Sequence, residues 1–306
     1  MLFVVNPTAA GGSVGRHWPD LESRIRSAIG DMEVEYTSEP WSAVSLVRSA
    51  LRRGKSDIAI VGGDGSVNEV LNGFIEDDRL VDRDARLTII PVGSGCDYAK
   101  ALGLPSGLEH AQRLLRSEVF RTVDVGKATY RSLQGTTETR YFANILEAGA
   151  GGAVVDKVNR SSKPFGGRFA FMWAIITTLP SYTNEVVEVR VDGELVAEEP
   201  MNSVIVANGM YYGSGLKPAP KAELDDGIFD LVLFGDIHFG DALRNLGKLR
   251  KGELVEHPKV KYLRGKSVSA TAQAEVLAEM DGELVGTLPM DVTILPHLLQ
   301  VRVLGD

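Results

Sequence analysis

The chain has 306 residues, of which 44% are apolar and 24% charged. This length is sufficient for two domains of ordinary size, although it does not exclude one. The net charge of −8, from 33 Lys and Arg against 41 Asp and Glu, argues against a general nucleic-acid binder, which usually carries a basic surface. The single cysteine, Cys96, excludes an internal disulfide and a cysteine-rich zinc site, and it fits a reducing cytoplasm.

The N-terminal part of the chain alternates strand-like and helical patterns. Apolar segments typical of strands lie at Leu2–Val5, Glu33–Tyr36, Ile58–Val61 and Leu87–Pro91. Helical periodicity separates them over residues 14–29, over residues 41–51 and after residue 66. This order predicts an α/β domain over residues 1–122, with a parallel sheet covered by helices on both faces. Ligands of such sheets bind at the carboxyl ends of the strands.

Turn-rich segments follow three of these predicted strands, at residues 6–13, 62–66 and 91–97. The second joins a strand to an amphipathic helix through three glycines and one carboxylate, Gly62, Gly63, Asp64 and Gly65, with Ser66 at the expected helix start. Glycine permits positive φ and lets N–H groups approach an anion, and a helix N-terminus favours negative charge. We therefore expect a nucleotide or phosphate site, with a structural turn as the alternative.

The carboxylate of Asp64 indicates that this site holds a further group besides a phosphate. It would repel a bound phosphate, so its presence indicates either Mg²⁺ or a hydroxyl whose proton must be removed. The three turns could converge on one nucleotide.

From about Val123 onward the pattern changes to short segments of alternating polar and apolar residues. These segments cover residues 186–191, 203–207, 229–234, 292–295 and 299–303. Asp192-Gly193 marks a hairpin turn, and helical patterns interrupt near residues 152–159 and 169–179. We predict a mainly β second domain over residues 123–306.

The longest mainly apolar run, residues 169–179, has 11 residues, which is short of the roughly 20 needed to span a bilayer. Its Phe169, Phe171, Met172 and Trp173 are expected to pack in a core, with the lining of a lipid cleft as the alternative. Further on, residues 244–266 hold eight Lys or Arg against two Glu. This basic stretch is either a solvated helix and hairpin or a patch facing anionic lipid headgroups.

Taken in order, these motifs resemble the diacylglycerol kinase-like lipid kinases, a family that includes bacterial soluble diacylglycerol kinases and the sphingosine and ceramide kinases. The resemblance covers nearly the whole chain. Its elements are Asn6-Pro7, residues 62–69, residues 91–97, Asp124-x-Gly126, residues 208–213, residues 220–227 and Asp281-Gly282-Glu283. It implies an N-terminal α/β domain akin to those of NAD kinases and phosphofructokinases, a C-terminal β-sandwich, and ATP in the cleft between them.

The resemblance also implies the site residues. Glu283 matches the family's proposed proton acceptor, Asp281 and Asp97 are further catalytic candidates, and Asp64 helps to hold Mg²⁺ and the phosphates. ATP contacts are expected from Asn6, Pro7, Thr8, Ala9, Ala10, Thr37, Gly62, Gly63, Asp64, Gly65, Ser66, Val67, Asn68, Glu69, Gly93 and Ser94. A separate structural cation site is expected at Glu223, Asp226 and Ile228, partly through backbone carbonyls. Taken alone, Asp281-Gly282 would indicate only a hairpin turn.

Two residues depart from the family pattern. Ser66 stands where most members have Thr, and it keeps the hydroxyl. Cys96 replaces an Asn, which removes an amide that can both donate and accept, and a thiol is a poor Mg²⁺ ligand. Either nucleotide or substrate preference has shifted, or that amide is dispensable here. We favour the interpretation that Cys96 is a small packing residue.

The resemblance thus predicts an ATP- and Mg²⁺-dependent kinase that phosphorylates the hydroxyl of a membrane lipid, diacylglycerol or a relative. A kinase of the same fold acting on a soluble alcohol and a catalytically silent nucleotide-binding regulator stay open as alternatives. The apolar run and the basic stretch favour a lipid. We expect a cytoplasmic protein that binds no nucleic acid; peripheral association with the inner face of the membrane and a homodimer are left open.

Overall fold

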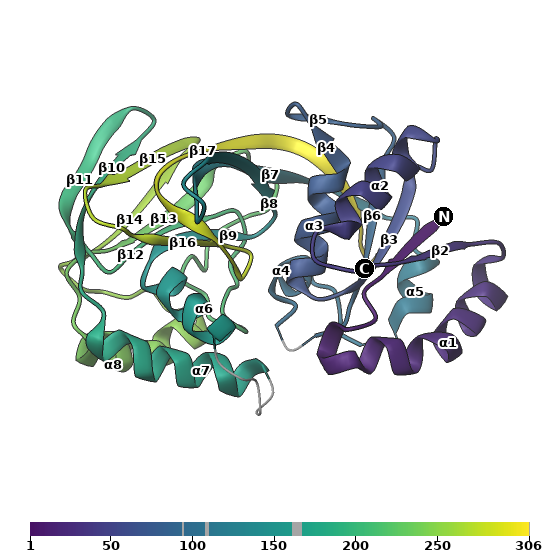
Figure 1. Ribbon diagram of the computed structural model, residues 1–306, viewed down its shortest axis with the longest axis horizontal. Coiled ribbons are helices and arrows are strands. Elements are labelled where there is room, and N and C mark those ends of the chain that lie inside the picture. The colour runs from purple at the N-terminus through teal and green to yellow at the C-terminus, as the bar shows by residue number, and fades with distance from the viewer. Residues whose placement is uncertain (94, 108–109, 161–166, 306) are drawn as a thin grey trace. The chain divides into compact units, whose positions relative to one another are not determined.

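The computed structural model of the protein describes residues 1–93, 95–107, 110–160 and 167–305, with the backbone alone for residues 167–171. The chain divides into two compact units (Figure 1, in which the colour follows the residue number). Unit 1 comprises Met1–Asp124 and His297–Asp306, and unit 2 comprises Val125–Pro296. The predicted second domain, 123–306, therefore differs at its C-terminal end, because the last ten residues return to unit 1.

Unit 1 contains a parallel sheet with the strand order β17-β6-β3-β1-β2. Its strands are β1 (Leu2–Val5), β2 (Glu33–Tyr36), β3 (Asp57–Gly62), β6 (Arg86–Pro91) and the C-terminal end of β17 (Glu283–Arg302). A short pair, β4 (Ile75–Glu76) and β5 (Arg79–Leu80), lies apart from it. The predicted parallel α/β sheet is confirmed.

Helices described between these strands are α1 (Ala9–Ile29), α2 (Ser42–Arg52), α3 (Asp64–Phe74), α4 (Asp97–Ala101) and α5 (Ala111–Leu115). The α1 and α5 helices pack on one face of the sheet, where Trp18 contacts Phe3 with ring centroids 5.9 Å apart. Across the sheet, the connection from β1 leads to β2 on one side, whereas the later connections, from β2 to β3 and from β3 to β6, lead the opposite way. Because such crossovers are right-handed, α2 and α3 cover the other face (Figure 1).

Unit 2 is a β-sandwich. One sheet has the order β14-β13-β12-β9-β16-β17, and the other joins β11, β10 and β15 to β17, with β7 and β8 beside it. The strands are β7 (Phe120–Ser132), β8 (Thr137–Phe142), β9 (Ile145–Gly149), β10 (Glu185–Val191), β11 (Glu194–Met201), β12 (Ser203–Ala207), β13 (Phe229–Phe234), β14 (Val260–Gly265), β15 (Ser267–Ala272) and β16 (Leu277–Met280). Buried apolar residues from both sheets form one core, in which Phe142 stacks on Phe229 at 5.8 Å. The predicted β-sandwich is confirmed.

The β17 strand links the two units along the chain. Two separate strands were expected in this region, at residues 292–295 and 299–303, but the structure has one strand of 20 residues. Its first part pairs with β16 and β15, and its end pairs in parallel with β6 through Gln300 and Val301. Alternation of polar and apolar residues shows that a segment is a strand, but not which sheet it joins.

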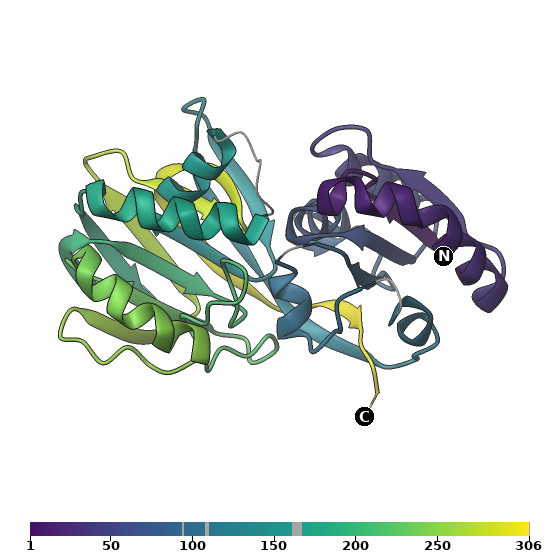
Figure 2. The same ribbon diagram turned by 90° about the horizontal axis from the view of Figure 1, so that it is seen from below.

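Among the described residues of unit 2, the strands are interrupted by α6 (Ala150–Arg160), α7 (Gly167–Thr178), the 3₁₀ turn η2 (Leu179–Ser181) and α8 (Phe239–Lys251). In Figure 2, α7 and α8 run beside each other on one face of this unit. Trp173 on α7 is 68% exposed, so the expectation that it packs in a core is wrong, while the side chains of Phe169 and Phe171 lie outside the described residues. Among the helices described, none combines the length and apolarity needed to cross a bilayer.

Candidate active site

Four of the residues expected to contact ATP lie at the carboxyl edge of the unit 1 sheet. Asn6 follows β1, Thr37 follows β2, Gly63 follows β3 and Gly93 lies just beyond β6. The chain leaves the neighbouring strands β1 and β3 in opposite directions, toward β2 and β6. Such a reversal of strand order opens the crevice in which open α/β sheets bind their ligands.

A side-chain bond joins the first two turns. Asn6 Nδ2 donates to Ser66 Oγ at 2.8 Å, while Asn6 Oδ1 accepts from the backbone N–H of Thr8 at 3.0 Å and from its hydroxyl at 2.8 Å. A Cβ on Gly62 would lie 2.7 Å from Ser66 Oγ, so Gly62 is the residue that allows this close approach.

The glycines of the second turn do not act as predicted. Gly63 is extended, with φ −95° and ψ −171°, and α3 begins at Asp64 with Gly65 in its first turn, ahead of the expected start at Ser66. The expectation of positive φ at this turn is therefore wrong, since Gly62, Gly63 and Gly65 all lack it, and Gly62 instead makes room for Ser66. The left-handed backbone lies instead in the first turn, at residues 10–12, with φ between 51° and 79°.

Asp64 joins the second turn to the third. Its carboxylate accepts the backbone N–H of Asp97 at 3.0 Å and that of Tyr98 at 3.2 Å, so it caps the start of α4. Asp97 is itself 5% exposed and pairs with Lys100 at 2.7 Å. The structure thus brings the three turns together around Asp64, and a carboxylate with further lone pairs could also ligate a cation.

Cys96 lies directly before α4 in left-handed backbone, with φ 51° and ψ 44°. Its side chain is buried, and burial raises the pKa of the Cys96 thiol to about 12, with the negative charge of Asp64 adding to the effect. The thiol is therefore neutral and packs against its surroundings. Left-handed backbone is a conformation that Asn tolerates better than most residues.

The remaining residues expected to contact ATP include several with structural partners. The Thr37 N–H donates to the carbonyl of Val5 at 3.0 Å, and Glu69 accepts the Ala43 N–H at 3.3 Å. Val67 is buried in the core, and Asn68 is buried and accepts from Asn72. Pro7, Ala9 and Ala10 lie in the first turn, and Ser94 lies outside the described residues.

In unit 2, Asp281 and Gly282 form the two-residue loop of the β16–β17 hairpin, with φ of 50° and 87°, as expected for a type I′ turn. The Asp281 carboxylate accepts N–H groups from residues 143, 144 and 145 at 2.9, 2.9 and 3.1 Å. Asp281 therefore ties the hairpin to the start of β9. Glu283, the first residue of β17, directly follows this loop and is exposed.

Of the three residues expected to form a structural cation site, Asp226 has other partners. Asp226 forms an ion pair with Arg264 and accepts the Ile228 N–H at 3.2 Å, while Glu223 is exposed. Across the described parts of the chain, no three Asp, Glu, His or Cys side chains gather closely enough to hold a metal ion. The Arg264 guanidinium thus lies against the Asp226 carboxylate, and the structural cation site at Glu223, Asp226 and Ile228 stays a prediction.

Unit 2 contains an apolar cavity lined in part by the apolar run of residues 169–179, for which the lining of a lipid cleft was the alternative expectation. It lies among α6, α7, α8 and the sheet. Val154, Ile175, Phe234, Leu246 and Leu249 contribute much of its wall. The lining residues are spread from position 147 to position 255, so no local pattern indicated the cavity, although the apolar run of α7 pointed to part of its wall.

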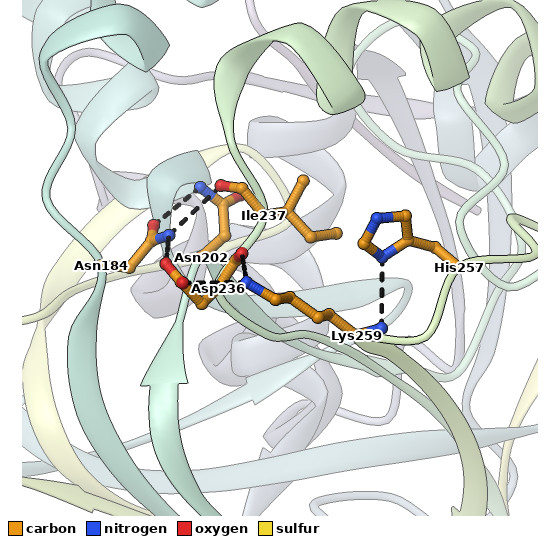
Figure 3. Close-up of polar contacts among 6 residues, drawn as sticks. All are labelled: Asn184, Asn202, Asp236, Ile237, His257 and Lys259. Carbon is orange, nitrogen blue, oxygen red and sulfur yellow. Dashed lines mark hydrogen bonds and ion pairs between the residues drawn. The ribbon is translucent and has the colours of Figure 1, made fainter.

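A polar network holds the segment that leads into α8 (Figure 3). Asn184 Nδ2 donates to Asp236 Oδ1 at 3.1 Å and to the carbonyl of Ile237 at 3.2 Å, and it receives a bond from Asn202 through Oδ1 at 3.1 Å. Lys259 Nζ donates to Asp236 Oδ2 at 2.9 Å, which lowers the pKa of Asp236. Because Asn202 and Ile237 line the cavity, the network fixes one of its walls.

The chain is similar to known proteins along its length. The family model "Diacylglycerol kinase catalytic domain" matches residues 1–128, and "YegS C-terminal NAD kinase beta sandwich-like domain" matches residues 144–303. A diacylglycerol kinase of Staphylococcus carnosus (strain TM300) is 27% identical over 299 residues, 98% of this chain and 93% of that protein. One of Bacillus subtilis (strain 168) is 26% identical over 288 residues, 94% of this chain and 90% of that protein.

Solved structures show the same fold. A diacylglycerol kinase from Bacillus anthracis str. Sterne has a TM-score of 0.71 at 22% identity, covering 98% of this chain and 95% of that chain. An NAD kinase from Archaeoglobus fulgidus, solved in complex with ATP, has a TM-score of 0.50 at 15% identity, covering 100% of this chain and 93% of that chain.

Proposed function

Because the chain belongs to the diacylglycerol kinase-like lipid kinase family, we propose that it uses ATP and Mg²⁺ to phosphorylate the hydroxyl of a membrane lipid, diacylglycerol or a relative. The observation that carries the nucleotide part of this proposal is the convergence of three turns of unit 1 on Asp64. Phosphoryl transfer depends mainly on positioning and on charge stabilisation, and this arrangement supports both.

The phosphates of ATP would meet the first turn of α3. N–H groups in the first turn of a helix have no acceptor within the helix, and they favour an anion together with the helix dipole. The oxygens of Asp64 are hard donors of the kind that Mg²⁺ prefers, so the residues present fit that ion. When bound, Mg²⁺ would neutralise phosphate charge.

Glu283 is the group that we propose as the proton acceptor. A lipid alcohol is a weak nucleophile, so a carboxylate within hydrogen-bond reach of its hydroxyl assists the attack. Glu283 is exposed and therefore accessible to an acceptor. Asp281, anchored by three backbone N–H groups, has a positioning role, because it fixes the hairpin that carries Glu283.

The apolar cavity of unit 2 favours a lipid over a soluble alcohol as the acceptor. A soluble alcohol needs no apolar space of this kind, whereas an acyl chain does. Ile176 and Leu243, which are 41% and 50% exposed, line the cavity and would let a chain enter from a membrane surface. The basic residues at the end of α8 favour docking of this face on a membrane, because they attract anionic headgroups.

The test is a transfer assay with purified protein, labelled ATP and Mg²⁺. Diacylglycerol, a long-chain amino alcohol and a monoacylglycerol would be supplied in mixed micelles, and glycerol and NAD in solution. Labelling of a micellar lipid is the expected result. Labelling of a soluble acceptor alone would favour the soluble-alcohol kinase, and ATP binding without any transfer would favour the silent regulator.

A further inference from the structure

The α7 helix is apolar on its solvent side as well as on the side that packs against the protein. Ala174 is buried, and Ile175 lines the cavity of unit 2. On the solvent side, Trp173 is 68% exposed, and Ile176, one turn further along the helix, is exposed as well. Helices with apolar side chains all round are typically buried. An exposed tryptophan on such a helix therefore indicates a surface that contacts an apolar partner.

This surface carries no charge of its own. Residues 169–184 contain no Asp, Glu, Lys or Arg, whereas the solvent side of a surface helix usually carries charged residues. The Thr177 hydroxyl turns back to the helix and donates to the carbonyl of Trp173 at 2.8 Å, so it adds little polar surface. Lys157 Nζ, from α6, donates to the carbonyl of Thr177 at 2.9 Å. The exposed side of α7 is thus apolar, with a positive charge at its C-terminal end.

Positive charge surrounds this apolar surface. The α6, α7 and α8 helices together contain seven Lys or Arg against two Asp, in a chain whose net charge is −8. All three helices line the same cavity, and α7 and α8 run beside each other (Figure 2). Both acids are paired, Asp156 with Arg160 at 2.9 Å and Asp241 with Arg244 at 3.1 Å. A second copy of the chain on this face would bring like charges together, whereas an anionic bilayer complements them.

We propose that α7 is a membrane anchor: Trp173 inserts at the boundary between headgroups and acyl chains of an anionic bilayer, and the basic residues of α6 and α8 contact the headgroups around it. The indole suits this depth, because it has an apolar body and one polar N–H. The helix then lies along the membrane surface, as interfacial helices do. This rests on the proposed function only in taking a lipid bilayer as the partner. It would bring Ile176, at the cavity wall, to the depth of the acyl chains.

The first experiment locates Trp173 in the membrane without nucleotide or acceptor, so it is independent of transfer. The full-length protein is added to vesicles of phosphatidylcholine and phosphatidylglycerol, in which the acyl chains of the phosphatidylcholine carry bromine near the headgroup. Bromine quenches the fluorescence of a tryptophan that it contacts. The unaltered protein should be quenched, and Trp173→Phe, which keeps Trp18 and Trp41, should lose that quenching. Equal quenching of both proteins, or none in either, would overturn the proposal.

The second experiment removes the anchor without a change of charge. The affinity of Trp173→Ser for such vesicles should fall about tenfold or more, the effect of withdrawing a large apolar side chain from the membrane. At high salt, which screens the basic residues, the unaltered protein should keep binding that Trp173→Ser lacks. Leu133→Ser is the matched control, because Leu133 is 54% exposed in the loop between β7 and β8, and its affinity should stay unchanged. Unchanged binding of Trp173→Ser, or an equal loss in both variants, would refute the assignment.

Analytical ultracentrifugation without vesicles separates a bilayer from a second copy of the chain as the partner of α7. The unaltered protein and Trp173→Ser should have the same mass, whereas a dimer that this substitution breaks would contradict the proposal. Transfer to a short-chain soluble diacylglycerol should be equal in the two proteins, while transfer to vesicle lipid should fall in Trp173→Ser. If no transfer is found at all while brominated lipid still quenches Trp173, the proposed reaction is wrong and the membrane anchor stands.

Discussion

At the scale of single residues, Asp64 has a structural task besides the one that its position in the glycine turn suggests. Its carboxylate holds α4 through the backbone N–H groups of Asp97 and Tyr98. Asp64→Asn keeps one acceptor oxygen but turns an amide donor toward one of these N–H groups. We expect a loss of about 1 kcal/mol in unfolding free energy, together with a loss of transfer of at least about a hundredfold.

Denaturant unfolding and the transfer assay measure these two effects on the same preparation. Lys100→Met provides a matched control, because it alters the partner of Asp97 while Asp64 stays intact. Transfer within a few-fold of the unaltered protein in Asp64→Asn would remove Asp64 from the chemistry and leave it only the task of holding α4.

Glu283 and Asp281 are neighbours in one hairpin with different expected roles. Glu283→Gln should lower turnover by about 10² to 10⁴, the usual contribution of a general base, with ATP affinity little changed. Asp281→Asn should instead lower the unfolding free energy by about 1–3 kcal/mol, because buried N–H groups lose an acceptor. Isothermal titration with ATP and denaturant unfolding distinguish them; a large loss of ATP affinity in Glu283→Gln would place this residue in the nucleotide site.

Cys96 allows a test of backbone conformation. Its left-handed φ of 51° suits Asn and penalises β-branched residues. Cys96→Asn should keep or raise both the melting temperature and the ATP affinity, whereas Cys96→Val, of similar volume, should lose about 1–2 kcal/mol of unfolding free energy. If instead the Asn variant is the less stable of the two, the apolar packing of Cys96 matters more than its backbone.

At the scale of elements, sequence periodicity predicted four of the five strands of the unit 1 sheet almost to the residue, whereas the end of β17 was expected in the second domain. The reason is that buried parallel strands are short apolar runs bounded by turns. The role of the glycines in the second turn was harder to predict. Gly62 makes room for Ser66, but in the sequence it cannot be distinguished from a glycine that adopts positive φ. The β17 strand was divided in two because pairing partners are set by tertiary contacts.

The pairing of β9 with β16 also escaped prediction, and it has a measurable consequence. It places Glu279 opposite Glu147, and burial raises the pKa of both acids. In the unfolded chain, glutamate loses its proton above about pH 4.3, while the folded protein retains these protons to higher pH. The folded state binds more protons in that window, so stability falls as pH rises from about 5 to 8.

Glu279→Gln should weaken this decline, because a neutral amide does not titrate and keeps an acceptor for the Gly282 N–H, which Glu279 accepts at 2.8 Å. Urea unfolding at about pH 5 and 8 gives the comparison. Glu275→Gln serves as a control, since Glu275 is exposed and should leave the pH dependence unchanged. An identical pH dependence in the Glu279→Gln variant would mean that Glu279 is ionised in the folded protein.

At the scale of the whole molecule, the basic stretch contrasts with a net charge of −8. Its first part forms the end of α8, where Lys248, Arg250 and Lys251 occupy the last turn. The same helix supplies Leu246 and Leu249 to the apolar cavity. Sequence alone showed the charges but not this cavity, because its wall is assembled from distant segments. A basic surface beside an apolar cavity is the arrangement that a lipid acceptor at a membrane would require.

Reversing Lys248, Arg250 and Lys251 to Glu should therefore weaken binding to vesicles that contain anionic lipid. Each basic residue near such a surface contributes about 1 kcal/mol, so we expect a loss of at least tenfold. The effect should shrink with added salt, since charge interactions are screened beyond about 10 Å at 0.1 M. Activity on vesicle lipid should fall in parallel, while activity on a short-chain soluble diacylglycerol should be spared, because the chemistry does not involve α8.

The control is a second triple reversal of equal charge, Arg52, Arg53 and Lys55 to Glu, at the C-terminal end of α2 in unit 1. It makes the same change in net charge at the end of another helix. It therefore separates the effect of a local basic surface on vesicle binding from the effect of the total charge. Equal loss of vesicle binding in both variants would mean that only the total charge matters. Equal loss on vesicle and soluble substrates would mean that α8 supports the fold, and unchanged vesicle binding would leave its basic residues as a solvated helix end.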